Sequence, residues 1–279
     1  MLKKAEIIES IKAFPPISSA AVELLPLLQE ENVNIVKVIQ TIECDPALTS
    51  NLLKTVNSAA YSGVRRISSI KEAVIRLGTK NIGQMVMVLS ADQCHQASAR
   101  AYDCTPEVLW EHSLAVAMGC EETAKSLNLN KPHYLFTAGL LHDLGKLVLS
   151  TFADVDVSMV QDLAMIQGKG LDEAEQEIHG VDHSELGAAL LEKWNFPPEI
   201  CGMVRFHHQP QKTPDNNVFT HLLKTMDALF SPESMQGGLF KLPYDSVTRI
   251  GLTADIVDKI RTGVTGSLEQ KKKLFSGKH

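Results

Sequence analysis

Apolar residues recur every three or four positions along almost the whole chain, whereas the period-two alternation of strands is almost absent. Ile35, Val38 and Ile42, for example, fall on one face of a helix. Asp45-Pro46 pairs a capping residue with a first-turn proline, as at a helix start. The spacing predicts an all-α fold with a short acidic segment at 171–178 and helices over residues 6–13, 18–29, 34–42, 46–56, 69–77, 79–96, 107–127, 132–150, 155–167, 182–194, 197–208, 217–230, 245–250 and 254–261.

Residues 98–106 form the clearest interruption of this helical pattern. Helices on both sides of the interruption predict a two-lobed helical bundle, because each layer of helices can bury an apolar face against another. We expect an N-terminal helical subdomain over residues 1–100, a second helical subdomain over residues 101–235, and a C-terminal helical extension and tail over residues 236–279. The three lysines at 271–273 are expected to belong to a frayed end.

The composition narrows the class of protein. The 279 residues carry a net charge of −6, which disfavours nonspecific binding to nucleic acid or an anionic membrane, and we expect neither as a partner. No apolar run approaches the roughly 18 residues of a membrane span, and the first residues show no apolar signal core. Five scattered cysteines without a CxxC motif indicate reduced thiols, so a cytoplasmic location is expected.

One mostly apolar run, residues 136–148, contains ionisable residues that a protein core normally excludes. His142, Asp143 and Lys146 stand there within five positions. Burying such groups costs free energy unless they are paired or bound to a metal. A histidine beside an aspartate suits Zn, Fe, Mn or Ni, and Lys146 would share a helical face with His142 and meet a phosphate. The alternative is a capped core helix with a surface salt bridge.

Further candidate metal ligands lie on or at the ends of predicted helices of the second subdomain, namely His112, His183, His207, His208 and Asp227. Helices of a bundle can bring such residues to one interior pocket. Together with His142 and Asp143 they make seven donors, which exceeds the four of a closed zinc site. We therefore predict a dinuclear centre of divalent metal bridged by Asp143. His179 is a poorer candidate, because Gly180 is expected to end its helix before His183.

Two sets of spaced residues carry a resemblance to known families. The first set comprises Phe14-Pro15, Asp45-Pro46-Ala47-Leu48, Asn57-Ser58-Ala59-Ala60-Tyr61, Ile67-Ser68-Ser69-Ile70, Ala73 and Leu77-Gly78. It resembles the HDOD family, the HD-related output domain of bacterial signalling proteins. The second set comprises His112-Ser113, the segment 138–146, His183, His207-His208 and Asp227. It resembles the HD phosphohydrolase superfamily, and HD-GYP phosphodiesterases in particular. The resemblance covers about residues 10–230 and implies an all-helical fold with a regulatory role, often without catalysis.

The chain departs from both patterns. HDOD members usually lack much of the HD ligand set, whereas this chain keeps it, and the retained ligands favour a bound metal. HD-GYP proteins follow their paired histidines with a Gly-Tyr-Pro segment, but residues 209–214 read Gln-Pro-Gln-Lys-Thr-Pro. Hydrolysis of a cyclic dinucleotide is therefore not expected.

The sequence alone does not decide whether the chain is an enzyme. One hypothesis is a regulatory module of signal transduction that binds a protein partner. The other is a metal-dependent phosphohydrolase, either a phosphomonoesterase or a phosphodiesterase, that acts on a phosphate-containing small molecule with Asp143 and Lys146 as catalytic residues. One metal would be held by His112, His142, Asp143 and Asp227, and the second by Asp143, His183, His207 and His208. A di-iron redox or oxygen sensor with the same ligands is a third reading.

Overall fold

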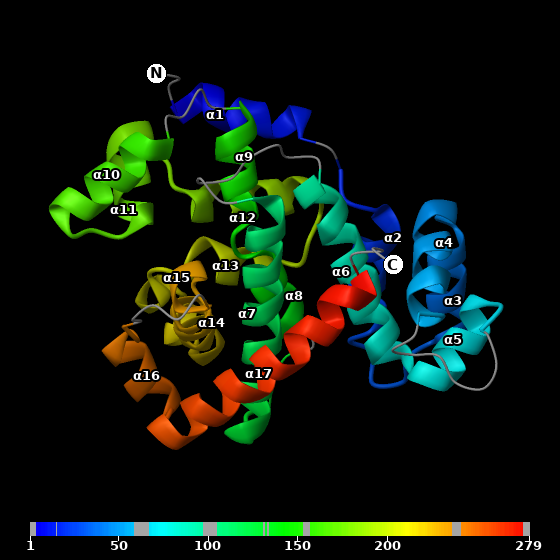
Figure 1. Ribbon diagram of the computed structural model, residues 1–279. Coiled ribbons are helices and arrows are strands. Elements are labelled where there is room, and N and C mark those ends of the chain that lie inside the picture. The colour runs from blue at the N-terminus through cyan, green and yellow to red at the C-terminus, as the bar shows by residue number, and fades with distance from the viewer. Residues whose placement is uncertain are drawn as a thin grey trace. The chain divides into compact units, whose positions relative to one another are not determined.

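The computed structural model describes residues 4–14, 16–58, 67–96, 105–130, 132, 134–152, 157–235 and 241–275. Helices form all of the regular secondary structure in these ranges, which confirms the predicted all-α class (Figure 1). None of these helices combines the length and apolarity needed to cross a bilayer. Among the residues that carry the family resemblance, Pro15 and residues 59–61 lie outside the described ranges.

The chain divides into two compact units. Unit 1 spans residues 1–15 and 95–262, and unit 2 spans residues 16–94 and 263–279. The first residues of the chain therefore group with the second half of the sequence. The division into subdomains at residues 1–100, 101–235 and 236–279 stays a prediction.

Unit 2 is a small helical bundle whose helices begin where the sequence supplies caps. It contains the helices α2 (Ser19–Leu27), α3 (Ile35–Glu43), α4 (Pro46–Val56), α5 (Ile70–Leu77) and most of α6 (Thr79–Gln96). The Asp45 carboxylate accepts a hydrogen bond from the backbone N–H of Leu48 (3.0 Å) and another from the Ser18 hydroxyl (2.7 Å). These bonds satisfy a free donor at the start of α4 and connect it to the residue that precedes α2.

Unit 1 holds most of the remaining helices. They are α1 (Lys4–Ser10), η1 (Ile11–Ala13), α7 (Pro106–Ser126), α8 (Leu135–Leu141), α9 (Leu144–Phe152), α10 (Val157–Gln167), α11 (Leu171–His179), α12 (His183–Lys193), α13 (Pro198–Arg205), η2 (Pro210–Lys212), η3 (Pro214–Asn216), α14 (Val218–Leu229), α15 (Pro232–Met235), α16 (Tyr244–Ile250) and the first part of α17 (Ala254–Phe275).

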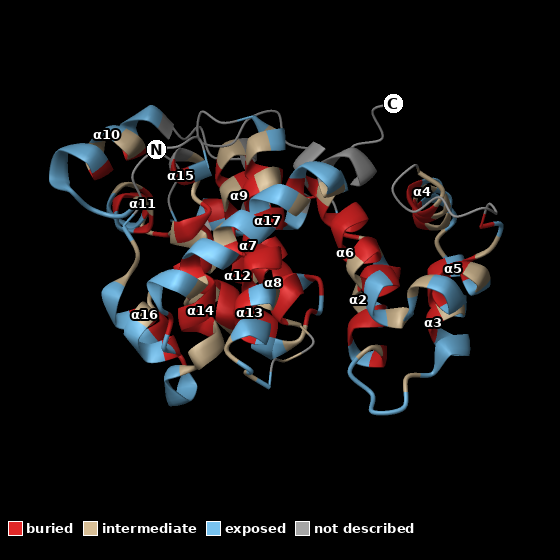
Figure 2. Ribbon diagram, turned by 60° about the horizontal axis from the view of Figure 1, so that its bottom comes forward, coloured by how far each residue is buried: buried red, intermediate tan, exposed pale blue. Residues whose placement is uncertain are grey.

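Two sets of packed helices form the core of unit 1. Helix α7 packs against α8 and α14, while α12 packs against α9 and α13, and α8 contacts α13 between the two sets. The middle of α7 is buried all round, since Leu114, Ala115, Val116 and Ala117 are fully enclosed. Figure 2 shows buried positions concentrated on α7, α8 and α12 in the interior of this unit. A helix enclosed on all sides places any polar side chain it carries inside the protein.

The prediction of a single helix over residues 132–150 is wrong. The helix is interrupted at His142 and Asp143, which separate α8 from α9. Nδ1 of His142 donates a hydrogen bond to the carbonyl oxygen of Gly139 (2.8 Å). In a continuous α-helix that carbonyl would accept from the backbone N–H of Asp143. Because of this break, His142 and Asp143 lie at the corner between α8 and α9 rather than within one helix.

The helix expected over residues 254–261 is also too short, because α17 runs on to Phe275. The helical spacing of Val257 and Ile260 continues beyond the predicted end at Val264 and Leu268. The expectation that the lysines at 271–273 belong to a frayed end is therefore wrong, since all three lie within this helix.

Replacing Asp45 with alanine tests the cap of α4. The hydrogen bond from Leu48 N–H lowers the pKa of Asp45, with burial opposing and Ser18 assisting. The carboxylate therefore stabilises the fold above the unfolded-state pKa, and this contribution is lost as pH falls through the lower folded-state pKa. We expect Asp45→Ala to reduce the free energy of unfolding by about 1 kcal/mol at pH 7, and the difference from wild type to vanish in acid.

Denaturant titration at several pH values measures this effect. Asp45→Asn is the matched control, since its amide oxygen can accept the bond from Leu48 N–H while its NH2 group can donate to the Ser18 hydroxyl. This variant should retain most of the stability without its pH dependence. Equal unfolding midpoints for wild type and Asp45→Ala at pH 7 would contradict the assigned role.

Candidate metal centre

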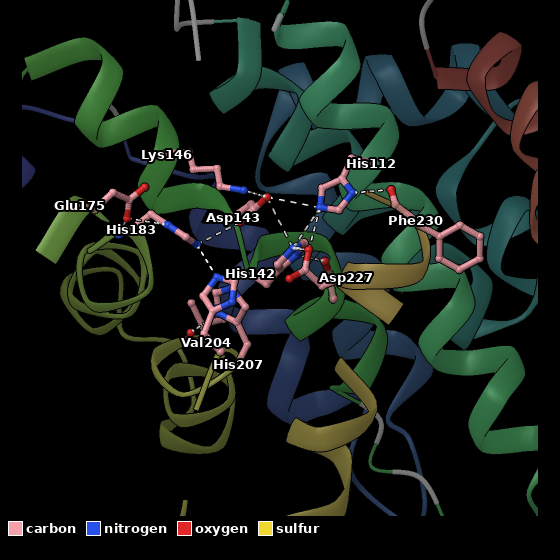
Figure 3. A network of polar contacts seen from close by, with 12 residues as sticks. His112, His142, Asp143, Lys146, Glu175, His183, Val204, His207, Asp227 and Phe230 are labelled. Atoms are coloured by element: carbon pink, nitrogen blue, oxygen red, sulfur yellow. Dashed lines mark hydrogen bonds and ion pairs between the residues drawn. The ribbon is translucent and has the colours of Figure 1, made fainter. Parts of the chain in front are cut away.

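The seven candidate ligands lie in unit 1, on or next to six helices, and Figure 3 labels all of them except His208. His112 projects from the middle of α7, and His142 and Asp143 occupy the break between α8 and α9. The others are His183 at the first position of α12, His207 and His208 just after α13, and Asp227 near the end of α14. Segments far apart in the sequence thus bring histidines and aspartates together.

A first group comprises His112, His142, Asp143 and Asp227, with one ligand atom of each within 4.8 Å of the others. Nε2 of His112 lies 3.2 Å from Nε2 of His142 and 3.3 Å from Oδ2 of Asp143. It also lies 3.3 Å from Oδ1 of Asp227, which is 3.5 Å from Nε2 of His142. Two imidazole nitrogens and two carboxylate oxygens therefore surround one point.

A second group comprises His183, His207 and His208, again with ligand atoms within 4.8 Å. Nε2 of His183 lies 2.9 Å from Nε2 of His208, and the His207 ring stacks at a tilt on His208 with 4.0 Å between centroids. Asp143 joins the two groups, because its Oδ2 faces His112 while its Oδ1 lies 3.5 Å from Nε2 of His183. This is the arrangement expected of a carboxylate that bridges two ions.

The hydrogen bonds of four imidazoles fix which ring nitrogen faces the centre. Nδ1 donates to a carbonyl oxygen in His112 (Phe230, 2.7 Å), His142 (Gly139, 2.8 Å) and His207 (Val204, 2.7 Å), and to a carboxylate in His183. A nitrogen that donates to such an oxygen carries the proton, so Nε2 of the neutral ring has a lone pair. Close pairs of such lone pairs repel each other unless a proton or a metal ion lies between them.

Two buried atoms in the centre lack a hydrogen-bond partner within the described residues, namely Nε2 of His207 and Oδ1 of Asp143. Both belong to residues with at most 1% of their surface exposed. Leaving buried polar atoms unpaired costs free energy, and metal coordination would remove that cost. Five imidazoles and two carboxylates form a donor set that fits divalent transition metals such as Zn, Fe, Mn or Ni.

The charges around Asp143 keep it ionised. Burial by itself would raise the pKa of Asp143, but the Lys146 ammonium, with Nζ 2.6 Å from Oδ2, and nearby imidazoles hold this pKa well below its usual range. The pKa of Lys146 is raised correspondingly, since the Asp143 and Asp227 carboxylates outweigh the effect of burial. A partly buried cation therefore already stands beside the candidate bridging carboxylate.

The two histidine groups differ in their preference for charge. Burial opposes the charged form of His112, yet the Asp143 and Asp227 carboxylates raise its pKa to about 9. Burial, together with neighbouring imidazoles, lowers the pKa of His208 to about 3 and that of His207 well below its usual value. The first group thus attracts positive charge, while these two histidines of the second group stay neutral at pH 7, as metal ligands must.

Glu175 supports the centre from outside, and the sequence reasoning missed it. Its Oε2 accepts hydrogen bonds from Nδ1 of His183 (2.7 Å) and from the backbone N–H of the same residue (2.6 Å), and its side chain is fully buried. Its acidic segment resembles an ordinary solvated face. The turn between α11 and α12 reverses the chain, so the spacing of the two residues carried no signal.

Two glycines let the helices that carry the ligands approach each other closely. An ideal Cβ atom at Gly145 would lie 1.9 Å from the carbonyl oxygen of His183, and one at Gly139 would lie 2.8 Å from Cα of Ala117. The first approach sets α9 against α12, and the second sets α8 against α7. Any side chain at these glycines would push the ligand groups apart.

Comparisons with known proteins agree with the family resemblance. The HDOD domain model matches residues 14–210. An uncharacterised protein of Treponema pallidum (strain Nichols) is 29% identical over 223 residues, which are 76% of this chain and 40% of that protein. The chain spans less than half the length of the curated relatives it matches.

Solved structures share the fold. An HDOD domain protein of unknown function from Geobacter sulfurreducens superposes with a TM-score of 0.76 at 22% identity, covering 96% of this chain and 98% of that one. A provisionally assigned phosphohydrolase from Shewanella amazonensis SB2B gives a TM-score of 0.71 at 22% identity, covering 98% and 97% of the two chains. At this identity the likeness concerns the fold alone.

Substituting Gly145 tests whether close backbone packing builds the centre. We expect Gly145→Ala to reduce the free energy of unfolding by about 1–3 kcal/mol, because the new methyl group collides with the backbone of α12. Gly202→Ala in α13 is the control, since an added Cβ there meets no atom within 4 Å. Chemical denaturation compares the two variants, and equal stabilities would argue against the role of Gly145.

Proposed function

Because this chain belongs to the HDOD family, we propose that it is a regulatory module of signal transduction in which unit 1 holds a dinuclear centre of divalent metal. The observation that carries the metal proposal is the set of Nε2 atoms turned toward one another by bonds at Nδ1. His112, His142 and Asp227 would hold one ion, and His183, His207 and His208 the other, with Asp143 shared between them.

The regulatory part of the proposal rests on the family and on the surface of unit 2. Ile35 and Val36 on α3 and Ile75 on α5 are 48%, 63% and 69% exposed, and these two helices pack together. Large apolar side chains exposed at a surface are a common feature of protein–protein contacts. We propose that a protein of the same signalling pathway binds this surface of unit 2.

Metal-dependent phosphohydrolysis is the second candidate function. It is favoured by the complete ligand set and by Lys146, a cation beside the centre that can bind a phosphate. The structurally similar Shewanella protein carries a provisional assignment as a phosphohydrolase. Two divalent ions would supply Lewis acids for phosphoryl oxygens and lower the pKa of water. In this reading Lys146 orients the phosphate, and Asp143 stays ionised to hold both ions.

Elemental analysis of protein purified without oxygen tests the centre. We expect about two divalent metal ions per chain. Asp143→Asn should bring the content below one ion, because the bridging carboxylate is lost. His221→Gln is the control, since His221 bonds to Ser246 and Asn216 away from the two groups. Wild-type protein free of metal would refute the centre.

The same preparations separate the two candidate functions. A screen with p-nitrophenyl phosphate and its bis-ester reports phosphomonoesterase and phosphodiesterase activity. Turnover that disappears in Asp143→Asn and in Lys146→Ala identifies a hydrolase. Metal-loaded protein without turnover supports the regulatory module.

Glu175→Gln should weaken metal binding without removing a ligand. The neutral amide holds the His183 ring less firmly and makes its Nε2 a weaker electron-pair donor to the metal. We therefore expect the metal dissociation constant to rise about 10- to 100-fold. Glu177→Gln on the same helix is the matched control, because Glu177 is exposed and pairs with Lys169. Competition with a chelating dye measures both constants. Equal values for Glu175→Gln and wild type would rule out this role.

A further inference from the structure

A cavity of about 570 Å³ lies in unit 1 beside the candidate metal centre, and His208 belongs to its lining. The walls come from α11, from the start of α12, and from the chain between the end of α13 and η2. Four carboxylates line this acidic pocket, namely Asp172, Glu173, Asp182 and Glu185, against two cations, Arg205 and Lys212. The pocket therefore carries excess negative charge, and one of its walls borders the candidate metal centre.

Most of these charges already have a structural task. Glu185 and Arg205 form ion pairs with side chains that do not line the pocket. Glu173 accepts a hydrogen bond from the backbone N–H just before α11. Asp182 accepts one from a backbone N–H in the first turn of α12. Asp172 lies in the first turn of α11 but makes no capping hydrogen bond there and no ion pair with a described residue.

Asp172 and Ser184 are the buried polar groups that point to a ligand. Asp172 is 8% exposed, and burial together with the nearby carboxylates raises its pKa. Ser184 is 3% exposed, lines the pocket, and its hydroxyl has no hydrogen-bond partner within the described chain. Both groups would gain from a ligand that brings positive charge and N–H donors.

A metal ion does not answer this need. Within the described residues, the side chains that converge like metal ligands are the two groups of the centre, and neither includes a pocket carboxylate. The volume of the cavity also suits an organic molecule rather than a bare ion. Lys212, in the same lining, offers the opposite preference, for an anion.

We propose that the acidic pocket binds a small phosphorylated amine. The Asp172 carboxylate pairs with the ammonium group of the ligand, and the Ser184 hydroxyl oxygen accepts a hydrogen bond from one of its N–H groups. The phosphate of the ligand lies toward His208 and the metal centre. The phosphate half of this proposal rests on the proposed metal centre, whereas the ammonium half rests on the pocket alone. The same ligand serves a regulatory module as an input signal and a hydrolase as a substrate.

Calorimetric titration with defined compounds tests the proposal. We expect O-phosphoethanolamine to bind about tenfold or more tightly than glycerol 1-phosphate, which has hydroxyls in place of the ammonium. Asp172→Asn should abolish this preference and leave the affinity for inorganic phosphate unchanged. Ser184→Ala should reduce the preference several-fold. Asp162→Asn on α10 is the matched control, because Asp162 is exposed and does not line the pocket.

The outcomes separate the pocket from the centre. Equal affinity of the wild-type protein for the two esters, or a preference that survives in Asp172→Asn, overturns the proposal. If elemental analysis finds no metal, titration with ethanolamine alone tests the pocket. Binding that Asp172→Asn removes supports the proposed ammonium site, and the absence of binding overturns the proposal. Glycerophosphoethanolamine identifies the source, because tighter binding of this diester indicates a lipid-derived headgroup and tighter binding of the monoester a soluble metabolite.

Discussion

The interior of unit 1 depends on imidazole Nε2 atoms that face one another. Each of these atoms has a lone pair that favours a cation. Bonds to carbonyl oxygens and to Glu175 hold the Nδ1 protons outward, so the Nε2 atoms of His112 and His142 meet at 3.2 Å. A protein gains nothing from enclosing such an arrangement for its own sake. The helical core around it is organised to keep these rings in place.

Close helix packing is the means by which that arrangement is held. The enclosed middle of α7 is lined by small residues, and Gly139 lets α8 lie directly on its backbone. Gly145 does the same for α9 against α12, beside the peptide of His183. Each ligand group is thus fixed by backbone-to-backbone contact, which permits far less movement than contact between long side chains.

Local sequence signals predicted most of the fold and the identity of the candidate ligands. Helical spacing gave the all-α class, and Asp45-Pro46 marked the start of α4. The break at His142 could not be predicted, because it depends on a side-chain bond to Gly139 and on the approach of α12. Glu175 was missed for a related reason, since only the turn before α12 brings it to His183. Tertiary contacts outweighed the local pattern at both places.

The corner between α8 and α9 has a mechanical consequence. His142 follows the end of α8 and Asp143 precedes the beginning of α9, so an ion bound by both residues would cross-link the two helices at the break between them. Withdrawal of that ion would remove this cross-link, and the folded population would then follow the free metal concentration by mass action. The fold would in this way report the metal supply of its surroundings.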